Sequence, residues 1–350
     1  MRVAHVRERH APAGSPWRLA AALDRDGTAW LDLEPARRRA TAADPNLAHD
    51  SALFRQPVTT LDAHLARGLR VAALAELVER FEPRPESGEG GEADAVLDGA
   101  ALDIAQPILS PPAFRDFYAF ERHVATIWER RGRPVPEAWF RLPIFYFSNT
   151  SELRGPGEPV WPPDGSLELD YELEVGALVD TPAVNLPAGT AEQAIGGYFV
   201  LNDWSARDLQ REETTVRLGP AKGKDFATSL GPWLVTPDEL ADARAPGATG
   251  PDLAMTATVR TRDGRELETS RGTWASARFS FGQMLARASA DVRLRPGEIL
   301  ASGTVGGGCL LEIREGTLGR FLEPGDTVTL RIERLGPLTT PVIERPGGRR

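Results

Sequence analysis

The stretch LELDYELEV, from Leu167 to Val175, constrains the fold of this chain more than any other. Acidic and apolar residues alternate in it without exception, and a period of two residues is that of a β-strand rather than a helix. We therefore predict a strand with one apolar face and one acidic face. The acidic face carries Glu168, Asp170, Glu172 and Glu174. Neighbouring carboxylates repel one another, and either solvent or a bound cation can relieve this repulsion. Such a row therefore fits either an exposed sheet face or a site that holds a cation.

A second predicted strand leads into a polar cluster. Ile195–Leu201 (IGGYFVL) has the β-branched and aromatic composition of a buried strand, and the polar segment 202–224 follows it directly. This segment contains Asp203, Arg207, Asp208, Gln210, Lys222 and Lys224. Polar groups at the end of a strand would face a common space from a rigid support, which suits an anionic ligand bound beside a metal. A solvated loop with ion pairs is the alternative.

The segment from Phe114 to Trp128 carries the chemically most interesting histidine, His123. We predict a helix that begins near Asp116, because apolar residues then recur every three or four positions. They are Phe117, Phe120, Val124 and Ile127. His123 would lie beside this stripe, either as a packed residue or as a catalytic base.

Carboxylates from three segments could form one metal site. The side chains of Glu172 and Glu174 would leave the same strand face roughly 6.5 Å apart, from a rise of about 3.3 Å per residue. Together with Asp116 and Asp203 they would form an oxygen-rich cage. Such a cage suits a hard divalent cation, with Mg²⁺ preferred and Ca²⁺ or Mn²⁺ possible.

The N-terminal part should contain a hairpin, a helix and a linker. Trp17–Leu33 predicts a hairpin that turns at Asp26-Gly27, and Leu61–Phe81 has the apolar spacing of a helix. The segment 82–92 (EPRPESGEGGE) has the composition of a linker. Four further histidines lack the spacing of metal ligands, and we interpret them as surface or packing residues. These are His5, His10, His49 and His64.

The C-terminal part predicts short strands, one helix and a glycine-rich loop. Strands are expected at 253–259, 297–300 and 327–332, and a helix at 279–288. The loop 300–312 (LASGTVGGGCLLE) should enter a strand that ends in Glu312. It lacks the Walker and Rossmann spacings, so we expect its glycines to let backbone N–H groups approach a ligand.

Composition excludes several classes of protein. The 350 residues carry 41 Lys and Arg against 50 Asp and Glu, a net charge of −9, with no basic tract for a nucleic acid. Cys309 is the only cysteine, which excludes an intrachain disulfide and a multi-thiolate zinc site. No signal-peptide core or membrane span is apparent, so we expect a soluble, cytoplasmic protein.

Several motifs occur in an order that resembles the fumarylacetoacetate hydrolase family over residues 110–336. They are DFYAFERH, LDYELEV, LNDWSARDLQ, GPAKGKDFATSLGPW and ASGTVGGGCLLE. The resemblance implies a β-rich α+β fold, with a small N-terminal α/β domain at 1–103 and a mixed β-roll catalytic domain at 104–345. It also implies a homodimer and a divalent metal. The metal ligands would be Asp116, Glu172, Glu174 and Asp203.

The same resemblance implies roles for the remaining site residues. His123 and Glu312 would activate water. Arg207, Gln210, Lys224 and Thr304 would hold the substrate or the developing anion, and Tyr118 and Tyr146 would contact substrate oxygens.

The function predicted from these residues is hydrolysis of a carbon-carbon bond in a small anionic β-diketo acid or acylpyruvate. The alternatives are a decarboxylase, hydratase or isomerase of a 2-oxo acid that acts through an enolate, and, in another class, a non-catalytic metal-binding scaffold. Neither nucleic acid nor membrane is an expected partner.

Overall fold

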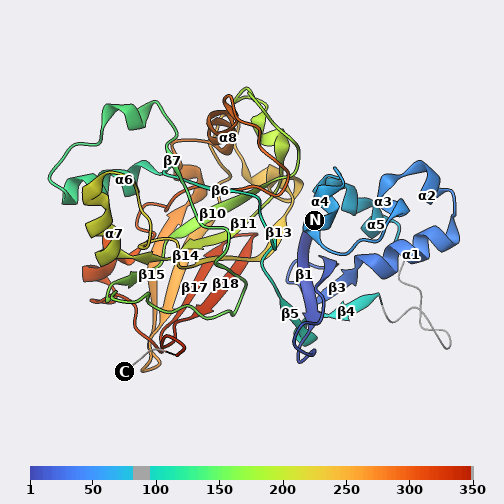
Figure 1. The fold of residues 1–350 in the computed structure, drawn as a ribbon, viewed down its shortest axis with the longest axis horizontal. Helices are drawn as coiled ribbons and strands as arrows, with labels where there is room; N and C mark the ends of the chain where they lie inside the picture. The colour runs from blue at the N-terminus through green and yellow to red at the C-terminus, as the bar shows by residue number, and fades with distance from the viewer. Residues whose placement is uncertain (82–94, 348–350) are drawn as a thin grey trace.

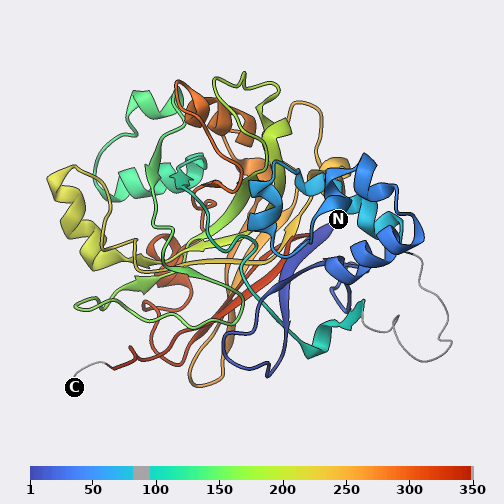
Figure 2. The ribbon, with the colours of Figure 1, turned by 45° about the vertical axis from the view of Figure 1, so that its right-hand side comes forward.

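The computed structural model describes residues 1–81 and 95–347 of the chain. They form a sheet-rich α+β fold with mixed sheets, as predicted. Helices α1 (Leu33–Ala43) to α5 (Ala75–Glu79) gather at one end of the molecule, and the larger β-rich body occupies the other (Figure 1). In the turned view of Figure 2 the C terminus again lies far from these N-terminal helices.

Within the described residues, twelve strands form the largest sheet. Ten of them follow one another across it in the order β4 (Val96–Asp98), β3 (Ala29–Asp32), β2 (Arg18–Ala22), β1 (Arg2–Glu8), β13 (Thr228–Val235), β11 (Ile195–Asp203), β10 (Leu173–Val179), β16 (Ile299–Ala301), β6 (Phe114–Phe117) and β7 (Phe145–Phe147). Off this path, β5 (Leu102–Ile104) pairs with β1, and β8 (Leu153–Arg154) pairs with β13. The pairs β16–β6 and β13–β8 are parallel, and the other pairs are antiparallel.

Two smaller sheets complete the β structure of the described chain. One has the order β15 (Glu266–Thr273), β14 (Ala254–Arg260), β17 (Thr327–Ile332) and β18 (Gly336–Pro341), and the other pairs β12 (Ser205–Ala206) with β9 (Leu169–Asp170). The helices are α1 (Leu33–Ala43), α2 (Leu47–Asp50), α3 (Ala52–Arg55), α4 (Leu61–Ala66), α5 (Ala75–Glu79), α6 (Glu121–Arg130), α7 (Arg207–Glu213), α8 (Phe281–Ser289) and α9 (Leu310–Ile313). No helix among the described residues has the length and apolar composition needed to span a membrane.

Strands β10, β11 and β13 lie at the centre of the large sheet, and every residue in them is buried. Burial on both faces explains why apolar residues and glycine occupy most positions of these strands. The N-terminal strands extend this sheet, because β1 pairs with β13 through Val3 and Leu234. The division into domains at 103 stays a prediction, and the predicted linker 82–92 lies outside the described residues.

Several predicted elements are confirmed. The hairpin of β2 and β3 turns at Asp26-Gly27, where Gly27 has a φ of 68°. Strands β11, β14, β16 and β17 and helix α8 lie where the sequence predicted them. The four N-terminal histidines are packing or surface residues as expected: His5 and His64 are buried with hydrogen bonds to backbone groups, and His10 and His49 are exposed.

The prediction of one strand from Leu167 to Val175 is wrong. Leu169 and Asp170 pair with β12, whereas Leu173 begins β10 of the large sheet, and Tyr171 and Glu172 connect the two strands. Both faces are buried from Leu169 to Val175, although Leu167 is exposed, so the alternation does not mark a solvent-exposed face. Buried ion pairs and hydrogen bonds accommodate the acidic residues instead.

Three further predictions of local structure are wrong. Asp116 lies on β6 rather than on a helix, because Phe120 is extended and α6 begins only at Glu121. The helix predicted at 61–81 is divided, since Gly68 has a left-handed φ of 74° and ends α4. Glu312 lies on the short helix α9 rather than at the end of a strand.

The close approach of β10 and β11 yields a stability prediction. A methyl group on Gly176 would lie 2.1 Å from Cε2 of Phe199. We expect Gly176→Ala to destabilise the protein by about 1–3 kcal/mol, the usual cost of overpacking a core. Urea unfolding measures this loss. Gly189→Ala is the control, because no atom lies within 4 Å of its added methyl group. Equal stability of the two variants would contradict this packing.

Candidate active site

One cavity of about 420 Å³ brings the predicted site residues together. Eleven of the twelve line it, and the twelfth, Glu312, contacts the lining residue His123. The eleven are Asp116, Tyr118, His123, Tyr146, Glu172, Glu174, Asp203, Arg207, Gln210, Lys224 and Thr304. Strands β6, β7, β10 and β11, helices α6 and α7 and four connecting segments supply them, so the large sheet forms a rigid base for the cavity.

Three carboxylates meet at the base of this cavity. Each of Asp116, Glu174 and Asp203 offers an oxygen atom, and the three oxygens lie within 4.8 Å of one another. The side chains come from β6, β10 and β11, and all three residues are at most 2% exposed. Their closeness therefore follows from sheet topology, although 87 residues separate the first from the last.

Burial and mutual repulsion dominate the electrostatics of this carboxylate cluster. Burial raises the pKa of Asp116 and Glu174 well above the ordinary value, and the neighbouring carboxylates raise both further. Burial also raises the pKa of Asp203, although the Lys224 ammonium group opposes the shift. The folded chain thus holds negative groups together at a free-energy cost that a bound cation would offset.

Glu172, the fourth predicted ligand, lies beside the cluster and is already paired. Its Oε1 atom is 2.7 Å from Nη2 of Arg207, and its Oε2 accepts a hydrogen bond from Nζ of Lys224. Burial alone would raise the pKa of Glu172, but the two cations lower it below the ordinary range. Lys224 also contacts Asp203, and so links Glu172 to the cluster.

The cluster fits a divalent cation. Oδ1 of Asp116 and Oδ1 of Asp203 are buried without a hydrogen-bond partner among the described residues. In the same part of the chain, Asp116 and Glu174 have no ion-pair partner, which leaves two negative charges unbalanced. Hard divalent cations prefer oxygen ligands of this kind. The metal-ligand roles of these residues nevertheless stay a prediction.

Tyrosine and backbone groups fix the cluster from the sides. The Tyr146 hydroxyl donates a hydrogen bond of 2.7 Å to Oδ2 of Asp203, and the Gly303 N–H donates one of 3.0 Å to Oε2 of Glu174. Thr304 donates to the other oxygen of Glu174 at 3.3 Å. Gly303 has a φ of 78°, and a Cβ there would lie 2.5 Å from the Phe117 carbonyl oxygen, so only glycine suits this approach.

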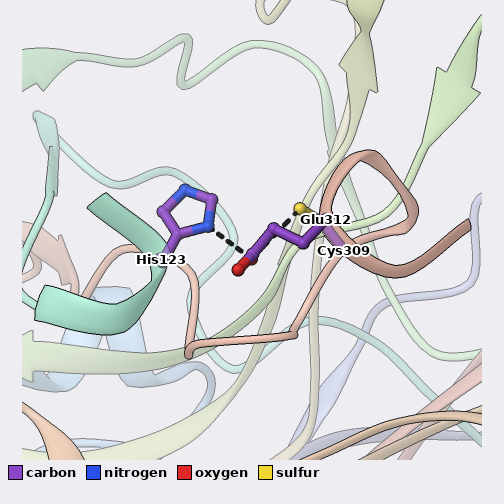
Figure 3. A group of neighbouring side chains, drawn as sticks. All are labelled: His123, Cys309 and Glu312. Carbon is purple, nitrogen blue, oxygen red and sulfur yellow. Dashed lines mark hydrogen bonds and ion pairs between the residues drawn. The ribbon is translucent and has the colours of Figure 1, made fainter. Parts of the chain in front are cut away.

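His123 and Glu312 form a buried dyad at the wall of the cavity. Nδ1–H of His123 donates to Oε1 of Glu312 at 2.6 Å, and the two side chains point toward one another (Figure 3). The Gly307 N–H donates to the second oxygen of Glu312. Burial alone would raise the pKa of Glu312, but the hydrogen bond that its carboxylate accepts from His123 lowers it. Because Nδ1 carries the proton, Nε2 is the nitrogen that can accept one.

Gln210 and Tyr118 are oriented by neighbours within the cavity. Nη1 of Arg207 donates to Oε1 of Gln210 at 3.0 Å, so the Gln210 amide group keeps its NH₂ donors for a ligand. The Tyr118 ring meets the His123 ring edge to face at 5.4 Å between centroids. Burial raises the pKa of Tyr118, which therefore stays a neutral hydroxyl donor at neutral pH.

The sequence did not reveal the role of Asp170 or Cys309. Asp170 accepts from Nε of Arg207 at 2.8 Å and from the backbone N–H groups of Leu310 and Leu311, and so ties Arg207 to the helix that carries Glu312. Cys309 donates to Glu312 at 3.4 Å (Figure 3). The alternating pattern placed Asp170 on the acidic face without distinguishing it from Glu172, and a lone cysteine carried no signal.

The glycine-rich loop differs from its prediction. Its N–H groups at Gly303 and Gly307 approach carboxylates of the protein itself, Glu174 and Glu312, rather than open ligand space. The loop therefore holds the acid cluster and the dyad in fixed orientations.

Comparisons with known proteins show the family to which the chain is similar. Residues 113–343 match the model of the fumarylacetoacetate hydrolase C-terminal domain. The fumarylacetoacetase of Oryza sativa subsp. japonica is 28% identical over 93% of this chain and 87% of its own length. The 2,4-didehydro-3-deoxy-L-rhamnonate hydrolase of Sphingomonas sp. is 30% identical over 60% of this chain and 67% of its own.

Solved structures share the fold. A fumarylacetoacetate hydrolase from Exiguobacterium antarcticum superposes with a TM-score of 0.64 at 20% identity, covering 99% of this chain and all of that one. A 5-carboxymethyl-2-hydroxymuconate delta-isomerase from Mycobacterium smegmatis gives 0.61 at 21% identity with the same coverage. The similar proteins thus include both hydrolases and an isomerase. On the family match, which spans most of the chain, the protein belongs to the fumarylacetoacetate hydrolase family.

Proposed function

We propose that the protein is a metal-dependent hydrolase that cleaves a carbon-carbon bond in a β-diketo acid or acylpyruvate. The observation that carries the proposal is the presence in one cavity of a buried carboxylate cluster and of a His123–Glu312 dyad. A scaffold that only bound a metal would need the first feature but not the second. The hydrolase names among the relatives support the same reading.

Asp116, Glu174 and Asp203 would hold the divalent cation, with Glu172 as the fourth carboxylate beside them. Mg²⁺ is the expected ion, and Mn²⁺ or Ca²⁺ are alternatives. When bound, such an ion supplies Lewis-acid polarisation of a carbonyl oxygen. The protein side chains would carry out the proton transfers.

The dyad provides the general base. Nε2 of His123 would take a proton from water as the oxygen adds to the carbonyl carbon, and the buried Glu312 carboxylate would stabilise the imidazolium that forms. When the carbon-carbon bond breaks, its electron pair stays on the leaving fragment as an enolate. The imidazolium can return its proton to that fragment, so protons balance over the cycle.

Cations and donors would stabilise the developing negative charge. Lys224 and Arg207 are the buried cations of the cavity, and the free NH₂ of Gln210 can donate to the tetrahedral oxyanion. Tyr118 would donate to a substrate oxygen, whereas Tyr146 and Thr304, which donate to Asp203 and Glu174, would contact the substrate beside these carboxylates. Aimed donors of this kind typically lower a barrier by about 3–4 kcal/mol each.

A decarboxylase, hydratase or isomerase reaction on a 2-oxo acid is the second candidate. The isomerase among the structural neighbours favours it at the level of fold. Such a reaction passes through an enolate, as the proposed hydrolysis does, but it has less need of a water-activating dyad. The pairing of His123 with Glu312 therefore favours hydrolysis. The homodimer implied by the family resemblance and the cytoplasmic location expected from the composition also stay predictions.

Turnover of a small substrate panel tests the proposal. We expect acetylpyruvate or fumarylacetoacetate to lose diketone absorbance with Mg²⁺ or Mn²⁺ present and to be stable with a chelator. His123→Ala should abolish turnover while metal binding persists, because the imidazole lies outside the carboxylate cluster. Release of carbon dioxide from oxaloacetate without diketone cleavage would instead establish the decarboxylase reaction. Full activity of His123→Ala would exclude the dyad mechanism.

Neutralising one carboxylate tests the metal site. In chelator, we expect Asp116→Asn to be at least as stable as the wild type, because it removes a buried like charge. Added Mg²⁺ or Mn²⁺ should raise the melting temperature of the wild type but not of this variant, since saturation at a hundredfold over Kd contributes about 2.7 kcal/mol. Asp164→Asn, at an exposed side chain, is the control. An equal metal response in all three proteins would place the ion elsewhere.

Glu312→Gln tests the second member of the dyad. Loss of the carboxylate should lower kcat by about 10²–10⁴, the range for positioned acid-base groups and their orienting partners. Glu315→Gln removes an equal charge from an exposed residue nearby and should keep full activity. Steady-state kinetics of both variants gives the comparison, and equal kcat values would exclude a role for Glu312.

The lowered pKa of Glu312 also predicts a pH dependence of stability. A carboxyl group whose pKa is lower in the folded state stabilises the fold above its unfolded pKa of about 4.3. The wild type should therefore exceed Glu312→Gln in stability at pH 7, and the difference should close as the pH falls through the lowered pKa. Urea unfolding from pH 7 to acid measures it; a difference that grew in acid would contradict the assigned shift.

A further inference from the structure

A second cavity, which we call the arginine cavity, shares no lining residue with the candidate active site. It measures about 370 Å³ and lies between the β2–β3 turn, the start of β1, and the β17–β18 hairpin. Its lining residues are Arg2, Arg25, Asp26, Trp233, Glu239, Arg331, Ile332, Arg334, Gly336 and Pro337. The N-terminal hairpin and the C-terminal sheet thus both contribute to it.

Positive charge exceeds negative charge in this lining, with four arginines against Asp26 and Glu239. Two of the arginines have acidic partners: Arg2 is 3.3 Å from Glu239, and Arg334 forms two hydrogen bonds to Asp242, which lies outside the lining. The other two, Arg25 and Arg331, are exposed and form no ion pair with any described residue. An anion in the cavity would therefore meet two cations that form no ion pair among the described residues, although the charge of Arg25 also contributes to the lowered pKa of Asp242.

Two buried donors in the lining also lack acceptors. Nε1–H of Trp233 and Nε–H of Arg2 have no hydrogen-bond partner in the part of the chain that the structure describes. Their residues are only 8% and 7% exposed. Buried N–H groups are nearly always satisfied in folded proteins, so an acceptor outside the chain is expected here. Beside several guanidinium groups, an anionic oxygen is a stronger acceptor than water.

We infer that the arginine cavity binds a small oxyanion with carboxylate or phosphate oxygens. Trp233 and Arg2 would donate to it from the buried end, and Arg25 and Arg331 would contact it from the exposed end. The planar guanidinium group suits both carboxylate and phosphate oxygens, so the two ligand chemistries share one site. This inference is independent of the proposed reaction, because the two cavities have no residue in common.

The indole N–H of Trp233 reports occupancy directly. The chain has eight tryptophans, and in a ¹⁵N–¹H spectrum of the full-length protein the Trp233 signal is the indole signal that Trp233→Phe removes. We expect titration with inorganic phosphate or citrate to shift this signal saturably, whereas sodium chloride at equal ionic strength should not. A response to phosphate alone or to citrate alone would assign the site to that ligand class and would support the inference.

The variant Arg25→Gln/Arg331→Gln tests the cationic contacts. Both side chains are exposed and unpaired, so the fold should be retained. Kd should rise by at least about tenfold, since one hydrogen bond to a charged group commonly contributes that factor. Arg271→Gln/Arg293→Gln removes the same charge from exposed residues outside the cavity and should leave Kd unchanged. A Trp233 signal unmoved by both anions, or one that sodium chloride shifts equally, would overturn the inference.

Discussion

The charge balance around Lys224 is the interaction on which the candidate active site depends. Lys224 is buried, contacts Glu172 and Asp203, and keeps its charge because these carboxylates raise its pKa against the effect of burial. Without it, neighbouring buried carboxylates would repel one another with little compensation. With it, Asp116 and Glu174 still have no ion-pair partner in the described chain, so the site remains suited to a divalent cation.

The large sheet makes this charge balance possible. Adjacent strands β10 and β11 bring Glu174 and Asp203 together, and β6 adds Asp116 through its parallel pairing with β16. Every residue of β10 and β11 is buried, so the carboxylates cannot relax into water without disrupting the core. In the unfolded chain these carboxylates could move apart, whereas in the folded protein the packing of the sheet holds them together.

The carboxylate cluster and the dyad are separate units joined by shared supports. Gly303 and Gly307 of one loop donate to Glu174 and Glu312, respectively. Asp170 joins Arg207 to the start of α9, which carries Glu312. A change in the glycine loop or at Asp170 would therefore disturb both units, although neither Asp170 nor Gly307 lines the cavity.

The sequence by itself determined the fold class, the strands near 195–201 and 327–332, and the set of residues that now lie in one cavity. These follow from local patterns and from motifs of a family to which the chain belongs. Only the tertiary structure decided that Asp116 lies on a strand, that both faces of 169–175 are buried, and that Asp170 supports Arg207 rather than the carboxylate cluster. One physical reason is that strand pairing brings together residues that are distant in the sequence. The other is that an alternating pattern is the same whether its polar face contacts water or a buried cation.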